Sequence, residues 1–82
     1  MSAAMSGRVL VYTRVGCHLC EVAEAEVARI CTELGLGFSS VDVDTDPELR
    51  AEYGDRVPVI MVDGREHGFF RVEEERLRAA LR

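Results

Sequence analysis

Two runs of consecutive apolar residues mark the centre of a predicted β-sheet. The runs at 9–12 and 59–62 contain only valine, leucine, isoleucine, methionine and tyrosine, as expected of strands that are covered on both faces. We place these strands at about 8–13 and 59–62. Two weaker runs, at 38–43 and 65–70, alternate loosely or carry charge, which is typical of edge strands. The pattern therefore predicts four strands, with the first and third in the middle of the sheet.

A long helix is predicted between the first two strands, from about 17 to 34. Apolar or small residues recur there with the three-and-four spacing of one helix face, and charged residues fall elsewhere. Gly35 ends the helix because glycine readily adopts the left-handed conformation of a helix C-cap. The predicted buried stripe consists of Cys20, Ala23, Val27, Ile30 and Leu34.

Two shorter helices follow in the second half of the chain. Asp46 is a suitable N-cap and Pro47 suits the first helical position, so a short helix is predicted from there to Gly54. The last helix begins near Glu73, with three glutamates in its first turn and arginines at its end, in agreement with the helix dipole.

The order of these elements predicts an α/β fold. Strand, helix and strand within about 36 residues form a βαβ unit, so the first two strands should be parallel with a right-handed crossover. Asp63-Gly64 is a strong signal for a tight hairpin between the third and fourth strands. Placing the apolar strands inside gives a four-stranded mixed sheet of order 2-1-3-4, flanked by three helices.

The length and charge of the chain limit its domain organisation and its possible partners. The 82 residues allow one domain, which we place at 8–82, after a disordered tail at 1–7 that does not look like a signal peptide. The net charge is −5, and the ten basic residues are all arginine and scattered, so we expect no nucleic-acid partner. No apolar run approaches the ~20 residues that span a bilayer. We expect a cytoplasmic monomer with no membrane partner.

Cys17 and Cys20 form a C-x-x-C pair between the end of the first predicted strand and the first turn of the long predicted helix. Both thiols lie within one predicted turn, so a disulfide closes with little backbone movement. Unpaired N–H groups and the dipole at the helix N-terminus favour a thiolate at Cys17. The pattern indicates thiol–disulfide exchange, with Cys17 as the nucleophile and Cys20 as the more buried, resolving thiol.

The residues around this pair resemble the active-site entry of glutaredoxins. From Tyr12 to Cys20 the chain has a tyrosine, a small hydroxyl residue, a basic residue, two further positions and C-x-x-C. Arg56-Val57-Pro58 is similar to the family's loop before the third strand, whose proline is cis and lies against the active site. The 2-1-3-4 order is also the family's order. Over residues 8–81 the chain resembles the small glutaredoxin-like proteins of the thioredoxin-fold superfamily.

This resemblance implies a thiol–disulfide oxidoreductase with a redox-active Cys17–Cys20 disulfide. Its partners would be disulfide-containing proteins or small molecules, together with a reductase or glutathione that recycles the thiols. The residues that the resemblance and their positions assign to substrate binding are Tyr12, Arg14, His18, Val57 and Pro58.

The chain departs from the glutaredoxins that bind glutathione. These typically continue after the fourth strand with Gly-Gly and an acid that holds the amino end of the tripeptide. Here Gly68 matches the first glycine, but Phe69 and Arg71 occupy the next informative positions. Arg71 and the amino end of glutathione are both positively charged, and like charges disfavour binding, so we expect glutathione to bind poorly. We expect no other bound cofactor.

Alternative roles for the thiol pair stay open at this point. A zinc or iron–sulfur site would need further ligands, and Cys31 lies about 16 Å from Cys20 along the helix at 1.5 Å per residue. We therefore expect no metal site, and Cys31 as a small apolar filler. The pair could also have no role beyond packing. A separate alternative is a non-enzymatic redox-sensing or protein-binding module that kept the fold.

The roles of several other polar and aromatic side chains can be interpreted from the sequence. His18, if cationic, would stabilise the Cys17 thiolate, and otherwise is a solvated residue. Arg14 is either a solvated charge or a partner for a substrate carboxylate. We expect His67 to be a surface residue of the edge strand. Since Phe69 and Phe70 are adjacent on a predicted strand, one of them should point away from the core.

Overall fold

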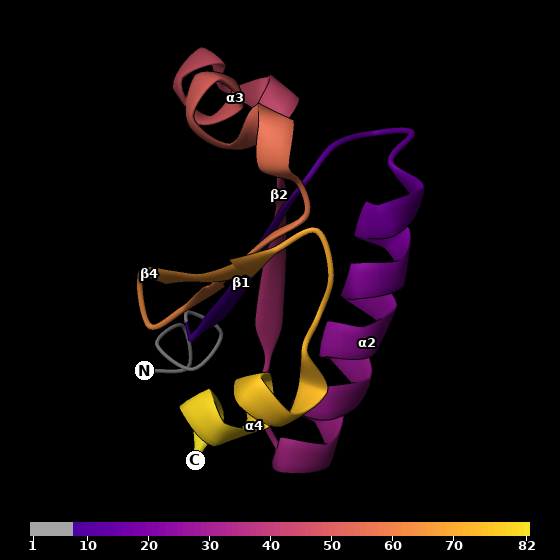
Figure 1. The fold of residues 1–82 in the computed structure, drawn as a ribbon, viewed down its shortest axis with the longest axis vertical. Coiled ribbons are helices and arrows are strands. Elements are labelled where there is room, and N and C mark those ends of the chain that lie inside the picture. The colour runs from indigo at the N-terminus through magenta and orange to yellow at the C-terminus, as the bar shows by residue number, and fades with distance from the viewer. Residues whose placement is uncertain (1–7) are drawn as a thin grey trace.

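The computed structural model describes residues 8–82 as a four-stranded sheet with helices against both faces (Figure 1). The predicted tail at 1–7 lies outside the described residues. All predicted strands and helices are present, with bounds close to those expected. In chain order the elements are β1 (Val9–Thr13), α2 (His18–Leu34), β2 (Phe38–Asp42), the 3₁₀ turn η1 (Val43–Thr45), α3 (Pro47–Tyr53), the 3₁₀ turn η2 (Gly54–Arg56), β3 (Val59–Val62), β4 (Arg65–Phe69) and α4 (Glu74–Leu81).

The sheet has the order β2-β1-β3-β4, which confirms the predicted topology. β1 is parallel to β2 and antiparallel to β3, and β3 is antiparallel to β4. The turn between β3 and β4 has φ values of 53° at Asp63 and 82° at Gly64. Positive φ at both central residues is what a type I′ hairpin requires, which explains the Asp-Gly sequence.

One face of the sheet packs against α2 and α4, and the core lies between these layers. The buried members are Val9, Val11, Val27, Ile30, Cys31, Ile60, Val62, Leu77 and Leu81. The predicted stripe of α2 is correct up to Ile30 but wrong at Leu34, which is 39% exposed. In the last turn of α2, Cys31 takes the core position instead, and Leu36 covers the core from just beyond the helix end.

The helix ends follow the predicted capping rules. Gly35 has the left-handed φ of 73°, and the next residue, Leu36, donates its N–H to the carbonyl of Cys31 at 2.8 Å. At the start of α3, the carboxylate of Asp46 accepts the N–H of Glu48 at 2.8 Å, and Pro47 occupies the first turn. These local signals therefore set the bounds of both helices.

A cluster of ion pairs joins α2 to α4. The carboxylate of Glu74 accepts hydrogen bonds from Arg29 and from Arg78, each at 2.9 Å. Arg78 also donates to Glu33. The two arginines lower the pKa of Glu74 from 4.5 to about 2. Glu74 is therefore ionised in the folded protein over almost the whole acid range.

This cluster predicts a specific loss of stability in acid. A carboxyl whose pKa is lower in the folded state contributes stability above its ordinary pKa of 4.5, and this contribution is lost as the pH falls towards 2. Between these pH values, the urea midpoint of the wild type should fall more steeply than that of Glu74→Gln, and added salt should reduce the difference. Glu75→Gln, on the exposed side of the same helix, is the control and should behave like the wild type. Parallel pH curves for wild type and Glu74→Gln would contradict this prediction.

Candidate redox site

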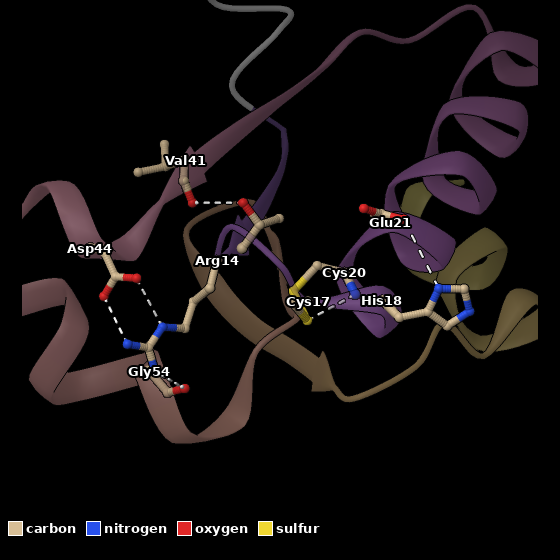
Figure 2. Close-up of a disulfide and its surroundings, with 9 residues drawn as sticks. Arg14, Cys17, His18, Cys20, Glu21, Val41, Asp44 and Gly54 are labelled. Carbon is tan, nitrogen blue, oxygen red and sulfur yellow. Dashed lines mark hydrogen bonds and ion pairs between the residues drawn. A yellow bond between two sulfur atoms is a disulfide. The ribbon is translucent and has the colours of Figure 1, made fainter.

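The turn between β1 and α2 places Cys17 at the start of the helix (Figure 2). Cys17 donates its N–H to the carbonyl of Arg14 at 3.3 Å, which closes the turn. Gly16 has a φ of 81° there, a conformation that residues with a Cβ rarely adopt. Val15, beside it, is 87% exposed. The sulfur of Cys17 therefore lies at the N-cap of α2, on an exposed turn.

Cys17 and Cys20 form a disulfide in this structure, with their Cα atoms 5.2 Å apart. Cys17 is half-buried, whereas Cys20 is only 2% exposed. The sulfur of Cys17 accepts the backbone N–H of Cys20 at 3.1 Å (Figure 2). An N–H group aimed at this sulfur, together with the helix dipole, would stabilise negative charge on it after reduction. The geometry thus distinguishes an outer sulfur with a donor from an inner sulfur packed under the turn.

Cys20 is among the residues that line a pocket behind the turn, although it is almost fully buried. Glu24, one helical turn after Cys20, and Asp42, at the end of β2, line this pocket together with Thr13. Two carboxylates therefore lie in the same pocket as the inner cysteine.

The peptide bond between Val57 and Pro58 is cis, as predicted. Pro58 is buried, and its carbonyl accepts the N–H of Phe70 at 2.8 Å. Because β3 runs antiparallel to β1 with Tyr12 opposite Val59, Pro58 lies at the level where β1 ends and the cysteine turn begins. The register therefore brings the proline loop and the cysteine turn to the same end of the sheet.

Arg14 is held by residues of the same chain. Its guanidinium makes two hydrogen bonds to the carboxylate of Asp44, at 2.9 and 3.0 Å, and a longer one of 3.5 Å to the carbonyl of Gly54 (Figure 2). Asp44 raises the pKa of Arg14 above its ordinary value. Arg14 thus ties the cysteine turn to η1 and η2, and its predicted contact with a substrate carboxylate stays a prediction.

Tyr12 faces the other side of the sheet from the core. Its neighbour Val11 is buried under α2 and α4, and adjacent strand residues point to opposite faces. The ring of Tyr12 stacks on Tyr53, the last residue of α3, with ring centroids 4.4 Å apart. The guanidinium of Arg56 lies 5.7 Å from the centre of the Tyr53 ring. Tyr12 therefore connects β1 to α3, and Tyr53 in turn contacts Arg56 of η2.

His18 is the first residue of α2 and is almost fully solvated. Its side chain is 84% exposed, and its Nδ1 lies 4.0 Å from a carboxylate oxygen of Glu21 (Figure 2). The side chain points away from the body of the protein, so it is available to a molecule that approaches the disulfide.

The third cysteine has no part in this site. Cys31 is 1% exposed within the core, and burial raises the pKa of its thiol. Within 8–82, no group of three or more histidine, cysteine or acidic residues is arranged to hold a metal ion. In the same range, no helix is long and apolar enough to cross a membrane.

Comparisons with known proteins agree with this geometry. A family model described as "Glutaredoxin-like domain (DUF836)" matches residues 8–82. This chain belongs to the glutaredoxin-like family. An uncharacterized protein of Mycobacterium tuberculosis is 44% identical over 79 residues, which cover 90% of this chain and 81% of that protein.

Solved structures place this glutaredoxin-like chain in the thioredoxin fold. An X-ray structure of a protein from X. campestris matches with a TM-score of 0.72 and 38% identity, covering 89% of this chain and 93% of that one. Fasciola hepatica thioredoxin matches with a TM-score of 0.60 and 25% identity, covering 96% and 83% of the two chains. The resemblance inferred from the sequence is thereby confirmed.

Sequence reasoning missed the partners that hold this glutaredoxin-like site in place. The sequence around Asp44 and Tyr53 gives neither residue a role in this site. Each contacts a residue more than 25 positions away, Arg14 and Tyr12 respectively. No local spacing signals such contacts. The only indication in the sequence is that Tyr12 and Arg14 lie at the end of a buried strand, where both side chains need partners.

Proposed function

We propose that this protein reduces disulfides of other molecules by dithiol exchange through Cys17 and Cys20. The observation that carries the proposal is the disulfide between a half-buried cysteine at a helix N-cap and a buried cysteine one turn later. Such a pair can be oxidised and reduced with little change in the backbone. Membership of the glutaredoxin-like family supports the same chemistry.

The reaction would take place in two exchanges. The thiolate of Cys17 attacks one sulfur of the target, so that a mixed disulfide forms and the target's own S–S bond breaks to release a thiolate. The sulfur of Cys20, after losing its proton, then attacks the sulfur of Cys17. This closes the Cys17–Cys20 disulfide and releases the second target thiolate. Two electrons pass to the target, and the protons of the dithiol pass to the released thiolates or to solvent.

The surroundings of the two sulfurs suit these different tasks. The N–H of Cys20 points at the sulfur of Cys17 and stabilises it as a thiolate, the nucleophilic form. Glu24 and Asp42 line the pocket that Cys20 shares, and offer acceptors for its proton, directly or through water. We further propose that His18 and Val57 contact the target, since they lie at the end of the sheet where the cysteine turn emerges. Pro58 is buried there and would act by holding Val57 in place.

A stoichiometric assay tests this function without knowledge of the natural reductant. The protein is reduced with a small dithiol, separated from this reductant and mixed with insulin whose native disulfides are intact. We expect two thiols to disappear per chain, with Cys31 retained, and one insulin disulfide to be reduced. Mass spectrometry should then find Cys17 joined to Cys20. If the reduced protein keeps its thiols and the insulin disulfides stay intact, the result would favour the alternative of a non-enzymatic redox-sensing or protein-binding module.

Glutathione should recycle the oxidised protein poorly, because Arg71 stands near the position where glutathione-binding members of the family place an acid. Arg71 lies just beyond β4, and its side chain is 80% exposed. The recycling rate should rise with glutathione without saturating below about 1 mM, and Arg71→Asp should lower the KM. Arg65→Asp, which makes the same charge change at the other end of β4, is the control. Saturation of the wild type in the micromolar range would show that other residues compensate for Arg71.

A further inference from the structure

Most of the exposed apolar side chains lie near the cysteine turn or at the end of β4. Among the described residues, the large hydrophobic side chains that are exposed are Val15, Leu19, Val22, Leu34, Phe69 and Phe70. Val15 belongs to the cysteine turn, and Leu19 and Val22 lie in the first two turns of α2. Only Leu34, at the far end of α2, is remote from the disulfide along its own element. Single exposed apolar residues need no explanation, but a gathering of them indicates a contact surface.

The phenylalanine pair lies at the same end of the sheet as the cysteine turn. Phe69 is opposite Val59 across β3 and β4, and Val59 is opposite Tyr12 across β3 and β1. Phe70, just beyond β4, donates its N–H to the carbonyl of Pro58 at 2.8 Å. Because neighbouring strands are about 4.8 Å apart, the end of β4 lies about 10 Å from the end of β1. An extended target chain crosses this distance in about three residues, at 3.3 Å per residue.

The backbone of Phe70 brings the two rings together. Adjacent residues of a regular strand point to opposite faces, but Phe70 has a φ of 73° and its ring meets the ring of Phe69 edge to face, with centroids 4.9 Å apart. A positive φ is unfavourable for a bulky residue. Even so, Phe69 and Phe70 stay 45% and 47% exposed, so this conformation gathers the rings without burying them. Unfavourable backbone conformations are concentrated at binding and active sites, and this one points to a contact with another molecule.

The molecule that must approach this end of the sheet is the target whose disulfide Cys17 attacks. Cys17 lies at the N-cap of α2, and Val15, two residues earlier in the turn, is 87% exposed. The cysteine turn and the end of β4 therefore both present apolar side chains to an incoming target. A small polar disulfide would leave the two phenylalanine rings in water, whereas a polypeptide with an apolar side chain near its cysteine would cover them.

We propose that Phe69 and Phe70 select polypeptide disulfides that carry a large apolar side chain about three residues from the reactive cysteine. This inference rests on the proposed function and adds a substrate class to it. The rings take no part in the transfer of electrons or protons, which follows the two exchanges described above. They hold the target, because its apolar side chain leaves water when it packs against them.

Two peptide disulfides test this selection. Each is a short peptide joined to a second copy of itself by one disulfide. In the first peptide, leucine stands three positions before and three positions after the cysteine, and in the second, serine replaces both leucines. The reduced full-length protein is mixed with each, and liquid chromatography measures the rate of reduction relative to that by dithiothreitol, which corrects for the intrinsic reactivity of the peptides. The leucine peptide should be reduced about tenfold faster, as expected from partial burial of one leucine side chain.

Two variants remove the rings one at a time. Phe70→Asn introduces a residue that tolerates a positive φ, and Phe69→Thr introduces one that is favoured in strands. Each should lower the ratio of the leucine rate to the serine rate to about threefold or less, with the fold verified by circular dichroism. Because both rates come from the same variant, a general change in the reactivity of Cys17 cancels. Leu34→Gln, which removes an exposed leucine at the far end of α2, is the control and should keep the ratio of the wild type.

The outcomes distinguish this inference from the function on which it rests. Equal rates of the wild type with the two peptides, or an unchanged ratio in either phenylalanine variant, would overturn the inference and leave the proposed function intact. If the wild type reduces neither peptide, the proposed function fails and the inference fails with it.

Discussion

Replacing Cys17 by Ser should reduce the rate of disulfide reduction by about 10³-fold or more, because a hydroxyl at this position cannot act as the attacking thiolate. The fold should be retained, since serine fits the N-cap of α2 and can accept the N–H that Cys17 accepts at 3.1 Å. The insulin assay gives the rate, and circular dichroism verifies the fold. A loss of activity with an intact fold is the expected result.

Replacing Cys20 by Ser should have a different effect. The first exchange still takes place, but no inner thiol remains to release the target, so a mixed disulfide should accumulate on Cys17. Non-reducing gel electrophoresis and peptide mass spectrometry would detect this species. Cys31→Ala is the control, because Cys31 is buried in the core away from the disulfide, and it should keep the full rate. A covalent adduct on Cys31, or a rate of insulin reduction by Cys17→Ser close to that of the wild type, would contradict the assignment.

Replacing Ile30 by Ala should destabilise the protein by about 2–5 kcal/mol, because it leaves a cavity between α2 and the sheet. Ile30 is 0% exposed and belongs to the core cluster on this face. A small domain has only about 5–15 kcal/mol of total stability, so the loss is a large share. The melting temperature should fall by more than about 10 °C, as measured by thermal denaturation.

Two variants on the same helix calibrate this effect. Ile30→Val removes one methylene group and should cost about 0.5–1.5 kcal/mol. Val22→Ala truncates a side chain that is 42% exposed and should change stability by less than about 0.5 kcal/mol. Equal losses for Ile30→Ala and Val22→Ala would mean that the core is not packed as described.

The features that were predictable from the sequence are those determined by near neighbours in the chain. Continuous apolar runs located β1 and β3, and Asp63-Gly64 located the hairpin, because both signals lie within a few residues. Cys17 and Cys20 are one helical turn apart at the start of a predicted helix, so their disulfide could be anticipated from their spacing and position. The cis bond before Pro58 could be anticipated only from the family resemblance, since most X–Pro bonds in folded proteins are trans.

The features that were not predictable depend on register or on distant partners. His67, expected at the surface, is half-buried: it is the extra residue at a one-residue irregularity in β4, and its Nε2 atom is buried. No residue type indicates where such a bulge falls. The same region contains the second surprise: Phe70, expected on a strand, lies beyond β4 with a φ of 73°, and both it and Phe69 are about half exposed. Alternation along a regular strand could not have shown this.

The contact between Arg8 and Leu81 has a consequence for how this protein can be joined to others. The guanidinium of Arg8 donates to the carbonyl of Leu81 at 3.3 Å, so the first and last parts of the described chain lie together. β1 leads from there to the cysteine turn, a path of about 15 Å at 3.3 Å per residue (Figure 1). Domains whose ends are adjacent tolerate insertion into a surface loop of a host protein. The segment from Arg8 to Leu81 could therefore be inserted into a host protein, with its ends anchored in the host and its cysteine turn facing away.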